Sequence, residues 1–150
     1  MKFIELTQGK KAIVDDEDFE MLSKFKWSCG GRGYARRRES GKTIWMHRII
    51  LNPKLSEQVD HISRDKLDNR RMNLRICNPS ENNFNCKIDR KNNTSGFKGV
   101  SKSGKKWVAL IQAYKKQFHL GTFDNKIHAA QAYNQAAIKY HGKFARLNIL

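Results

Sequence analysis

Residues 59–85 decide the fold, and they read VDHISRDKLDNRRMNLRICNPSENNFN. The first four, 59–62, place an acid and a histidine between two apolar residues and predict a short strand. Residues 63–71 are almost all polar or charged, which is the composition of a loop. Apolar residues return at alternate positions over 72–76 and predict a second strand.

A helix is predicted directly after the second strand. Asn78 has the side chain of a helix N-cap, and Pro79 suits the first helical position. Glu81 follows three residues after the cap, as in a capping box. The predicted helix continues to Asn85, so the stretch has the order strand, loop, strand, helix.

Three polar residues in this stretch suggest a reaction. Asp60 and Asn82 offer a carboxylate and an amide oxygen, the hard ligands that suit Mg²⁺ or Mn²⁺. A neutral imidazole at His61 could take a proton from an attacking water, while the ion stabilises charge on a phosphate. Neighbours on a strand face opposite sides, so Asp60 and His61 reach one site only if the strand ends or twists there.

The same stretch resembles the HNH (ββα-metal, or His-Me finger) nuclease motif of phage and intron-borne homing endonucleases. The matching residues are Asp60-His61-Ile62, Asp68-Asn69-Arg70-Arg71-x-Asn73-Leu74-Arg75 and Asn78-x-Ser80-Glu81-Asn82-Asn83. The resemblance implies that His61 is the general base and that Asp60 and Asn82 bind the metal. Asn82 stands in place of the family's last histidine. Asn73 is then the middle asparagine, which holds the loop and orients the catalytic histidine.

Other residues near the motif have alternative interpretations. Asn83 and Asn85 are alternatives to Asn82 as the metal ligand. His47 is the nearest competitor of His61, and we interpret it as a structural or DNA-backbone residue, with a role near the metal left open.

Composition limits the function classes. The chain has 150 residues, a formal net charge of +16, and 39% hydrophobic residues. No run approaches eighteen apolar residues, and the N-terminus lacks the apolar stretch of a secretory signal. Aromatic residues make up 10%, too many for a disordered basic tail. A polyanion binder, or a basic enzyme that acts on a polyanion, remains.

The three cysteines have no C-x-x-C spacing and indicate neither a disulfide framework nor a four-cysteine zinc site. We expect reduced thiols in a cytoplasmic protein, in the bacterial host cytosol if a phage encodes it. A zinc site of Cys77, Cys86 and a histidine is the alternative.

Residues 1–50 are predicted to be β-rich. Strands are expected at 3–6 and 11–14, and later at 33–38 and 43–48 around a turn at 39–42. The acidic run at 15–18 is predicted to start a helix, because acids suit its positive dipole end; a metal site is the lesser alternative. Arginines crowd the second hairpin. Two interpretations are equally favoured: the arginines are the charges of an edge strand that prevent aggregation, or they contact phosphates. Arg36 and Arg38 are the DNA-binding candidates among them.

Charge changes along the chain. Residues 1–92 carry twenty Lys and Arg against thirteen Asp and Glu, whereas residues 93–150 carry ten against one. The net charge is therefore +7 over residues 1–92 and +9 over the shorter segment 93–150. This rise in charge per residue predicts a domain boundary near 91–93, within a polar linker at 89–96.

The last part of the chain is predicted to form three strands and one helix. The strands are expected at 97–101, 106–114 and 117–123, and a helix at 125–140. Asp124 is the predicted helix cap, and Gly142 the predicted end.

This part resembles the DNA-binding domain of the plant Apetala/ethylene-response-factor family. The matching residues are Gly96-Phe97-Lys98-Gly99-Val100, Lys106-Trp107-x-Ala109-x-Ile111, His119-Leu120-Gly121-Thr122-Phe123, Ala129-Ala130-x-Ala132-Tyr133-x-x-Ala136-Ala137 and Gly142-x-x-Ala145-x-Leu147-Asn148. In that family the sheet lies in the major groove. The implied contacts are Lys98, Ser101, Trp107, Gln112, Gln117 and His119, with Lys102, Lys105, Lys106, Lys115 and Lys116 on phosphates. Several arginines of the plant pattern are Lys, Ser or Gln here, so its target sequence does not transfer.

Together these features predict an α+β protein in three parts. A β-rich part at 1–50 and a ββα-metal core at 51–90 form the nuclease; a linker and a three-stranded antiparallel sheet packed on one helix follow at 91–150. We expect a site-specific homing endonuclease that needs Mg²⁺ or Mn²⁺ and binds double-stranded DNA, with no membrane and no obligatory protein partner. A monomer would nick, and two chains would have to meet on DNA to cut both strands. The main alternative is a DNA-binding regulator with a vestigial nuclease centre; an RNA-directed nuclease is more remote.

Overall fold

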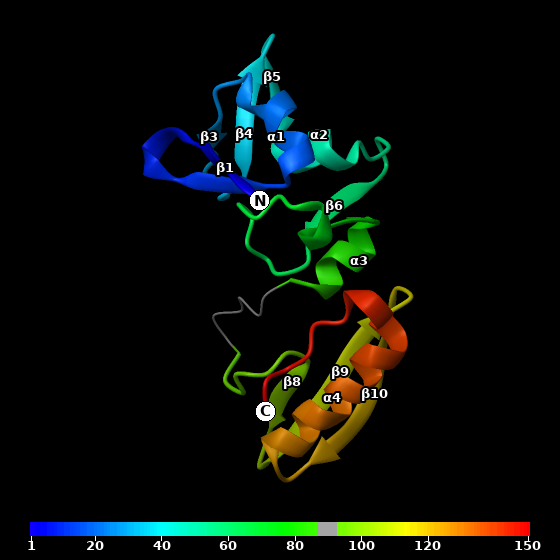
Figure 1. Cartoon of the computed structure of the whole chain (residues 1–150). Coiled ribbons are helices and arrows are strands. Elements are labelled where there is room, and N and C mark those ends of the chain that lie inside the picture. The colour runs from blue at the N-terminus through cyan, green and yellow to red at the C-terminus, as the bar shows by residue number, and fades with distance from the viewer. Residues whose placement is uncertain (87–92) are drawn as a thin grey trace. The chain divides into compact units, whose positions relative to one another are not determined.

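The computed structural model describes residues 1–86 and 93–150. Within them the chain is mixed α+β, as predicted (Figure 1). The helices are α1 (Asp16–Ser23), α2 (Met46–Leu51), α3 (Pro79–Phe84) and α4 (Lys126–His141). The strands are β1 (Lys2–Glu5), β2 (Lys11–Val14), β3 (Ser28–Cys29), β4 (Ala35–Glu39), β5 (Lys42–Trp45), β6 (Gln58–His61), β7 (Leu74–Cys77), β8 (Val100–Ser103), β9 (Lys106–Ala113) and β10 (Lys116–Phe123).

The chain divides into two units, Met1–Asn82 and Asn83–Leu150. The boundaries predicted at residues 50 and 90 remain predictions. The linker predicted at 89–96 and the boundary predicted at 91–93 both overlap residues 87–92, which lie outside the described residues. None of the described helices is long and apolar enough to cross a membrane.

The first unit is built from three small sheets. Antiparallel pairs β1–β2 and β6–β7 flank a three-stranded sheet in the order β3-β4-β5. Helix α1 begins within the acidic run, as predicted, and buries Leu22. Trp27 is 2% exposed, and its Nε1 donates to the Leu22 carbonyl at 2.8 Å, which fixes the largest core side chain to the end of α1.

The strand predicted at 43–48 is wrong in its second half. β5 ends at Trp45, and α2 begins at Met46. Met46 and Ile50 are buried one helical turn apart, so an α-helix places both in the core, where an extended chain would not. The helix ends at Asn52, which adopts a left-handed conformation with φ 43° and donates its N–H to the Arg48 carbonyl.

The predicted order strand, loop, strand, helix is present at β6, β7 and α3. β6 and β7 pair antiparallel, with Asp60 opposite Arg75 and His61 opposite Leu74. The capping box is also present: the Glu81 N–H donates to Asn78 Oδ1 at 2.9 Å, and the Asn78 N–H donates to Glu81 Oε2 at 2.8 Å. β7 starts later than predicted because residues 71–73 form a single 3₁₀ turn.

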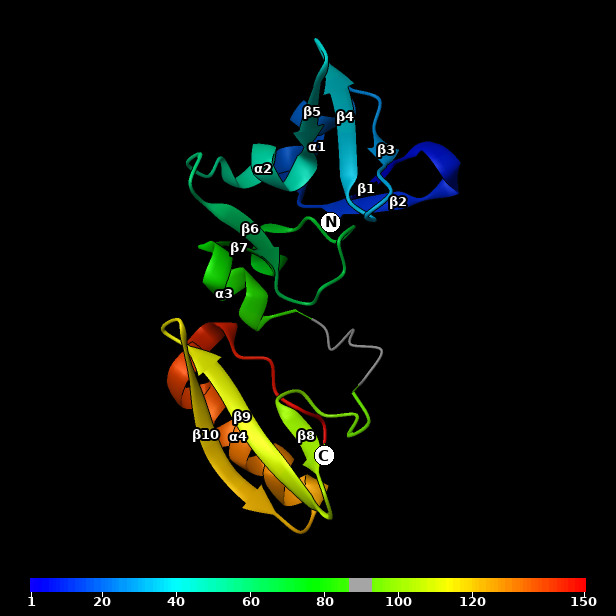
Figure 2. The same ribbon diagram turned by 180° about the vertical axis from the view of Figure 1, so that it is seen from behind.

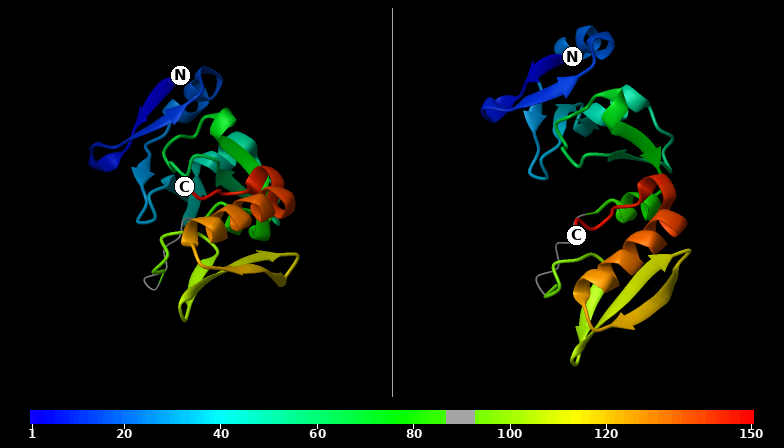
Figure 3. Two further views of the ribbon diagram at one scale, coloured as in Figure 1. Left: turned by 90° about the horizontal axis from the view of Figure 1, so that it is seen from below. Right: turned by 60° about the horizontal axis from the view of Figure 1, so that its bottom comes forward.

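The second unit contains an antiparallel sheet in the order β10-β9-β8 and helix α4, which lies along one face of it (Figures 2 and 3). Alternate residues of β9 face the helix, and Ala109 and Ile111 are almost fully buried against it. Small alanines on α4 allow this close approach. The predicted end at Gly142 is confirmed.

The cap of α4 is Asn125, not the predicted Asp124. Asn125 has an extended backbone, and its Oδ1 accepts from the Ile127 N–H at 2.8 Å. Asp124 lies one residue before the cap position. Its side chain is exposed, and its Oδ1 lies 3.4 Å from Lys106 Nζ. The first strand is also shorter than predicted and begins at Val100.

Candidate active site

His61 is the last residue of β6 and lies almost fully buried at 4% exposure. Its Nε2 lies 3.4 Å from Asn69 Oδ1. The Asn69 amide nitrogen donates to the Leu67 carbonyl at 3.1 Å, which assigns Oδ1 as the acceptor. Nε2 of a neutral His61 therefore carries the hydrogen, and Nδ1 is the nitrogen that can accept a proton.

Burial also sets the protonation state of His61. It lowers the pKa of the imidazole below its ordinary 6.5, outweighing the Asn69 hydrogen bond and the carboxylates of Asp60, Asp65 and Asp68, which raise it. The neutral ring is the form that a general base needs.

Asp60 lies on the opposite face of β6 from His61. Its Oδ2 accepts from Arg75 Nη2 at 2.5 Å and from Arg75 Nε at 2.8 Å, across the β6–β7 pair. Gln58 shares this face, because it is two residues away on the strand. The Asn82 amide nitrogen donates to Gln58 Oε1 at 2.7 Å, so the start of α3 covers the Asp60 face.

These contacts bring Asp60 and Asn82 to one face of β6 and leave His61 on the other, at the end of the strand. No cluster of three or more His, Cys, Asp or Glu side chains suited to a metal occurs within residues 1–86 and 93–150. A site with one carboxylate and one amide oxygen fits Mg²⁺ or Mn²⁺, which keep several waters and bind substrate phosphate. Asn83 is exposed, whereas Asn85 is buried.

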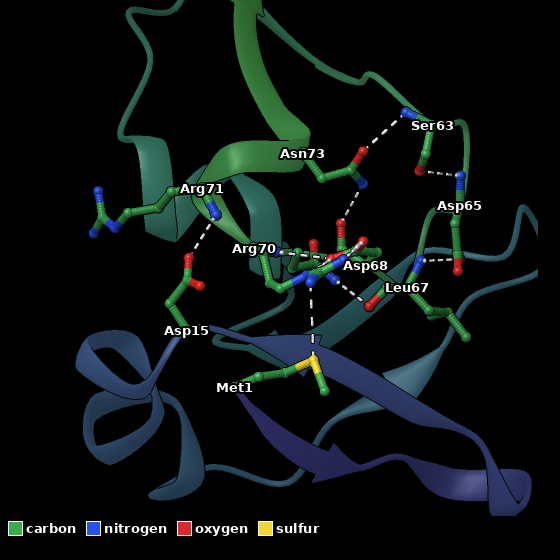
Figure 4. Close-up of polar contacts among 10 residues, drawn as sticks. Met1, Asp15, Ser63, Asp65, Leu67, Asp68, Arg70, Arg71 and Asn73 are labelled. Atoms are coloured by element: carbon green, nitrogen blue, oxygen red, sulfur yellow. Dashed lines mark hydrogen bonds and ion pairs between the residues drawn. The ribbon is translucent and has the colours of Figure 1, made fainter.

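Asn73 holds the loop that follows His61 (Figure 4). Its Oδ1 accepts from the Ser63 N–H at 2.8 Å, and its amide nitrogen donates to the Asp68 carbonyl at 2.7 Å. Its own carbonyl accepts from the Ile62 N–H at 2.8 Å. One buried side chain therefore joins the beginning and the middle of the loop to the residue just before β7.

The loop is also tied to the N-terminal hairpin. The Ile13 N–H donates to the Leu67 carbonyl, and the Asn69 N–H donates to the Ile13 carbonyl, both at 2.8 Å. Asn69 is completely buried, so strand β2 fixes the residue that contacts His61.

The acidic run anchors the residues just before Asn73. Arg71 donates to both carboxylate oxygens of Asp18, at 2.7 and 2.9 Å. Its backbone N–H donates to Asp15 Oδ2 at 2.7 Å (Figure 4). Asp15 and Asp18 therefore lie at the beginning of α1 and also bind Arg71, the first residue of the 3₁₀ turn at 71–73.

Replacing Asp18 should destabilise the first unit. Asp18 is 4% exposed, so Asp18→Ala removes charge-assisted hydrogen bonds from a buried place and should cost about 1 to 3 kcal/mol of unfolding free energy in urea titrations. Glu17 contacts the same guanidinium with a carboxylate that is 66% exposed. Glu17→Ala should change stability by less than about 1 kcal/mol, and an equal loss in both variants would contradict this account.

Two aromatic rings lie against His61, and a third lies behind one of them. The His47 ring lies 5.2 Å from it edge-on, and the Tyr34 ring lies 5.6 Å away, both measured between centroids. Trp45 stacks on His47 at 6.1 Å. From the sequence, His47 is interpreted as a structural or DNA-backbone residue with a role near the metal left open, and Tyr34, which no local motif marks, is not identified. Asn69 and Arg75 stood inside the matched motif but were given no role.

His47 should make stability depend on pH. Burial, together with the charges of His61 and Arg48, lowers the pKa of His47 from 6.5 to about 3. The unfolded chain therefore binds the proton first as pH falls, and stability is lost below pH 6.5. Between pH 7.5 and 5.5 the wild type should lose about 1.4 kcal/mol more than His47→Phe, measured by urea unfolding. Equal losses would contradict the assignment.

The β4–β5 hairpin separates its arginines by face. The Arg37 guanidinium carbon lies 4.0 Å from the Phe25 ring centroid, and Nη1 donates to Glu39 Oε1 at 2.7 Å. The Arg37 side chain therefore makes its contacts within the first unit. Arg36 and Arg38 alternate with it on the other face of β4. Tyr34 precedes them on that face and contacts His61.

The structure distributes the DNA-binding candidates of the second unit over several places. Ser101, Lys106, Gln112, Gln117 and His119 lie on the outer face of the sheet, away from α4. Trp107 packs in the core on the helix side, and Lys102 Nζ lies 6.0 Å from its ring. Lys105, Lys115 and Lys116 are exposed at the strand connections, whereas Lys98 Nζ donates to the carbonyls of Phe84 and Cys86.

The sequence is similar to two viral proteins. An uncharacterised HNH endonuclease of Acanthamoeba polyphaga mimivirus is 32% identical over 148 residues, which cover 94% of this chain and 76% of that protein. Protein 3.8 of Escherichia phage T7 is 37% identical over 90 residues, which cover 59% of this chain and 73% of that protein. No protein-family model matches the chain.

Proposed function

Because this chain belongs to the HNH endonuclease family, we propose that it is a site-specific, homing-type DNA endonuclease that hydrolyses a phosphodiester bond. The observation that carries the proposal is His61: a buried, neutral imidazole at a strand end, whose Nε2 lies 3.4 Å from Asn69 Oδ1. With one His61 per chain, a monomer nicks one strand, and a double-strand break needs two chains.

In this proposal β6, β7 and α3 form a ββα-metal centre. His61 takes the proton of the attacking water at Nδ1, and Asn73 holds the loop that carries Asn69. Asp60 and Asn82, on the face covered by α3, would hold Mg²⁺ or Mn²⁺. When bound, the ion supplies charge stabilisation at the scissile phosphate and the leaving 3′ oxygen. The products are a 5′-phosphate and a 3′-hydroxyl.

A second candidate is a DNA-binding regulator with a vestigial nuclease centre. The observation that favours it is the ion pair between Asp60 and Arg75, since the guanidinium occupies the carboxylate oxygen that a cation would use. Cleavage assays distinguish the two candidates.

Substitutions at Asn82 test the proposed centre. Asn82→Ala should raise the Mg²⁺ concentration for half-maximal nicking about tenfold or more, and Asn82→Asp should lower it, because a carboxylate binds the ion more strongly. Both variants lose the amide that donates to Gln58, so a purely structural role would impair both. Asn83→Ala is the matched control at the exposed neighbouring position. Nicking that persists in EDTA, or a weaker metal response in Asn82→Asp, would count against the proposal.

We further propose that the outer face of the β8–β10 sheet docks on the DNA duplex. It presents Ser101, Lys106, Gln112, Gln117 and His119 beside the apolar Val108 and Leu110, and α4 covers only the opposite face (Figure 3). Arg36 and Arg38 supply a second phosphate contact in the first unit, on the strand face that leads to Tyr34.

Charge reversal on the outer face should weaken binding in a salt-dependent way. Lys106→Glu should lower DNA affinity and reduce the slope of log K against log salt by about 1, as measured by fluorescence anisotropy. Lys139→Glu makes the same charge change at an exposed position of α4 and is the control. If the two variants behave alike, the outer face is not the docking surface.

A further inference from the structure

Tyr34 and His47 form an aromatic wall against His61. The three rings contact one another pairwise, with centroids 5.2 Å apart for His47–His61, 5.6 Å for Tyr34–His61 and 5.3 Å for Tyr34–His47. The two wall residues come from different elements, one just before β4 and the other in α2. They therefore hold His61 from two directions.

Ring contacts can set the orientation of His61 where a long hydrogen bond does so weakly. The distance from Nε2 to Asn69 Oδ1 is 3.4 Å, at the long end of the hydrogen-bond range. The outer torsion of a histidine side chain is broad, so packing against neighbouring rings restricts the ring plane. Rotation of the ring would move Nδ1 away from the place where it accepts a proton.

His47 is an unusual residue for a purely apolar packing role. It is 8% exposed, and its Nδ1 is buried with no hydrogen-bond partner among the described residues. Such a nitrogen is costly to bury, and an aliphatic side chain would avoid that cost. Met46 and Ile50, on the same helix, already fill the hydrophobic core. What His47 adds is a flat ring against His61.

We infer that His47, with Tyr34, is a positioning residue that fixes the ring plane of His61 and so keeps Nδ1 presented for proton transfer. The inference rests on the proposed role of His61 as the base. His47 acts through His61 and does not itself take part in the reaction.

Three variants of the full chain test this inference by kinetics. His47→Ala should lower kcat up to about 100-fold with KM unchanged, because a misplaced base loses rate and not substrate binding. His47→Phe restores a flat ring and should recover most of the rate. Ile50→Ala removes a core side chain of the same helix that is 4% exposed; it should lower the melting temperature while kcat stays close to wild type below that temperature. Unchanged kcat in His47→Ala, or equal losses in the Ala and Phe variants, would overturn the inference.

An NMR measurement separates this inference from the proposed function. The Cε1–H resonance of His61 is shifted by the ring currents of its aromatic neighbours, and it can be observed without cleavage. It should move and broaden in His47→Ala and stay near its wild-type position in His47→Phe and Ile50→Ala. A wild-type protein that does not cut DNA would defeat the proposed function while this spectrum still reports on the wall. An identical His61 resonance in wild type and His47→Ala would defeat the wall alone.

Discussion

His61→Ala is expected to reduce DNA nicking by about 10²- to 10⁴-fold, the contribution typical of a general base. Affinity for DNA should stay unchanged, because the ring is 4% exposed and its contacts are to Asn69, Tyr34 and His47. Nicking of supercoiled plasmid measures the first quantity, and a gel-shift titration measures the second.

Two controls make this result specific to the base. Ile76→Ala, at a residue of β7 that is 41% exposed, should cut at the wild-type rate. Added imidazole should restore part of the rate to His61→Ala and leave wild type unaffected, since it replaces the missing proton acceptor. A His61→Ala protein that cuts normally would remove His61 from the reaction, and joint loss of binding and folding would indicate a structural role.

Gly99→Ala should unfold the second unit. Gly99 has φ +72°, and a Cβ there would lie 2.1 Å from Cδ2 of Tyr133 and 2.5 Å from the Leu110 carbonyl oxygen. Neither neighbour can move easily, because Tyr133 is 2% exposed and the Leu110 N–H donates to the Gly99 carbonyl at 2.8 Å. The left-handed backbone and the clash together should cost about 2 to 5 kcal/mol. Amides of β8, β9 and β10 should lose hydrogen-exchange protection, and DNA affinity should fall.

Gly104→Ala separates the two causes. Gly104 also has a positive φ, of 58°, but nothing lies within 4 Å of a Cβ placed there. Its loss should be limited to the backbone cost of about 1 to 2 kcal/mol. Equal destabilisation in the two variants would show that the close approach of Gly99 to Tyr133 does not matter.

Local signals in the sequence predicted the parts of the fold that local interactions form. The Asn78–Glu81 capping box needs only a turn of chain, and it was predicted residue by residue. The cap of α4 was misplaced by one residue because Asp124 and Asn125 are both good caps, and only backbone geometry distinguishes them. The strand predicted at 43–48 extends past Trp45, whereas the core requires Met46 and Ile50 on one helical face.

The candidate site was predictable only where its residues are close in sequence. Asp60, His61, Asn73 and Asn82 share one motif, but the ring contacts of Tyr34 and His47 with His61 form through tertiary packing. The pairing of Asp60 with Arg75 depends on strand register, which the sequence of the residues between them does not reveal. The acidic run shows the same limit: its helix start was predicted, and its contacts with Arg71 were not.

Cleavage of DNA by the centre around His61 can be measured on supercoiled plasmid that carries the DNA flanking the chain's own reading frame. The purified chain with Mg²⁺ should produce nicked circles that DNA ligase reseals without further treatment, because the ends are a 5′-phosphate and a 3′-hydroxyl. If the wild-type chain binds this plasmid and leaves it as supercoiled as His61→Ala does, the centre around His61 does not cut DNA.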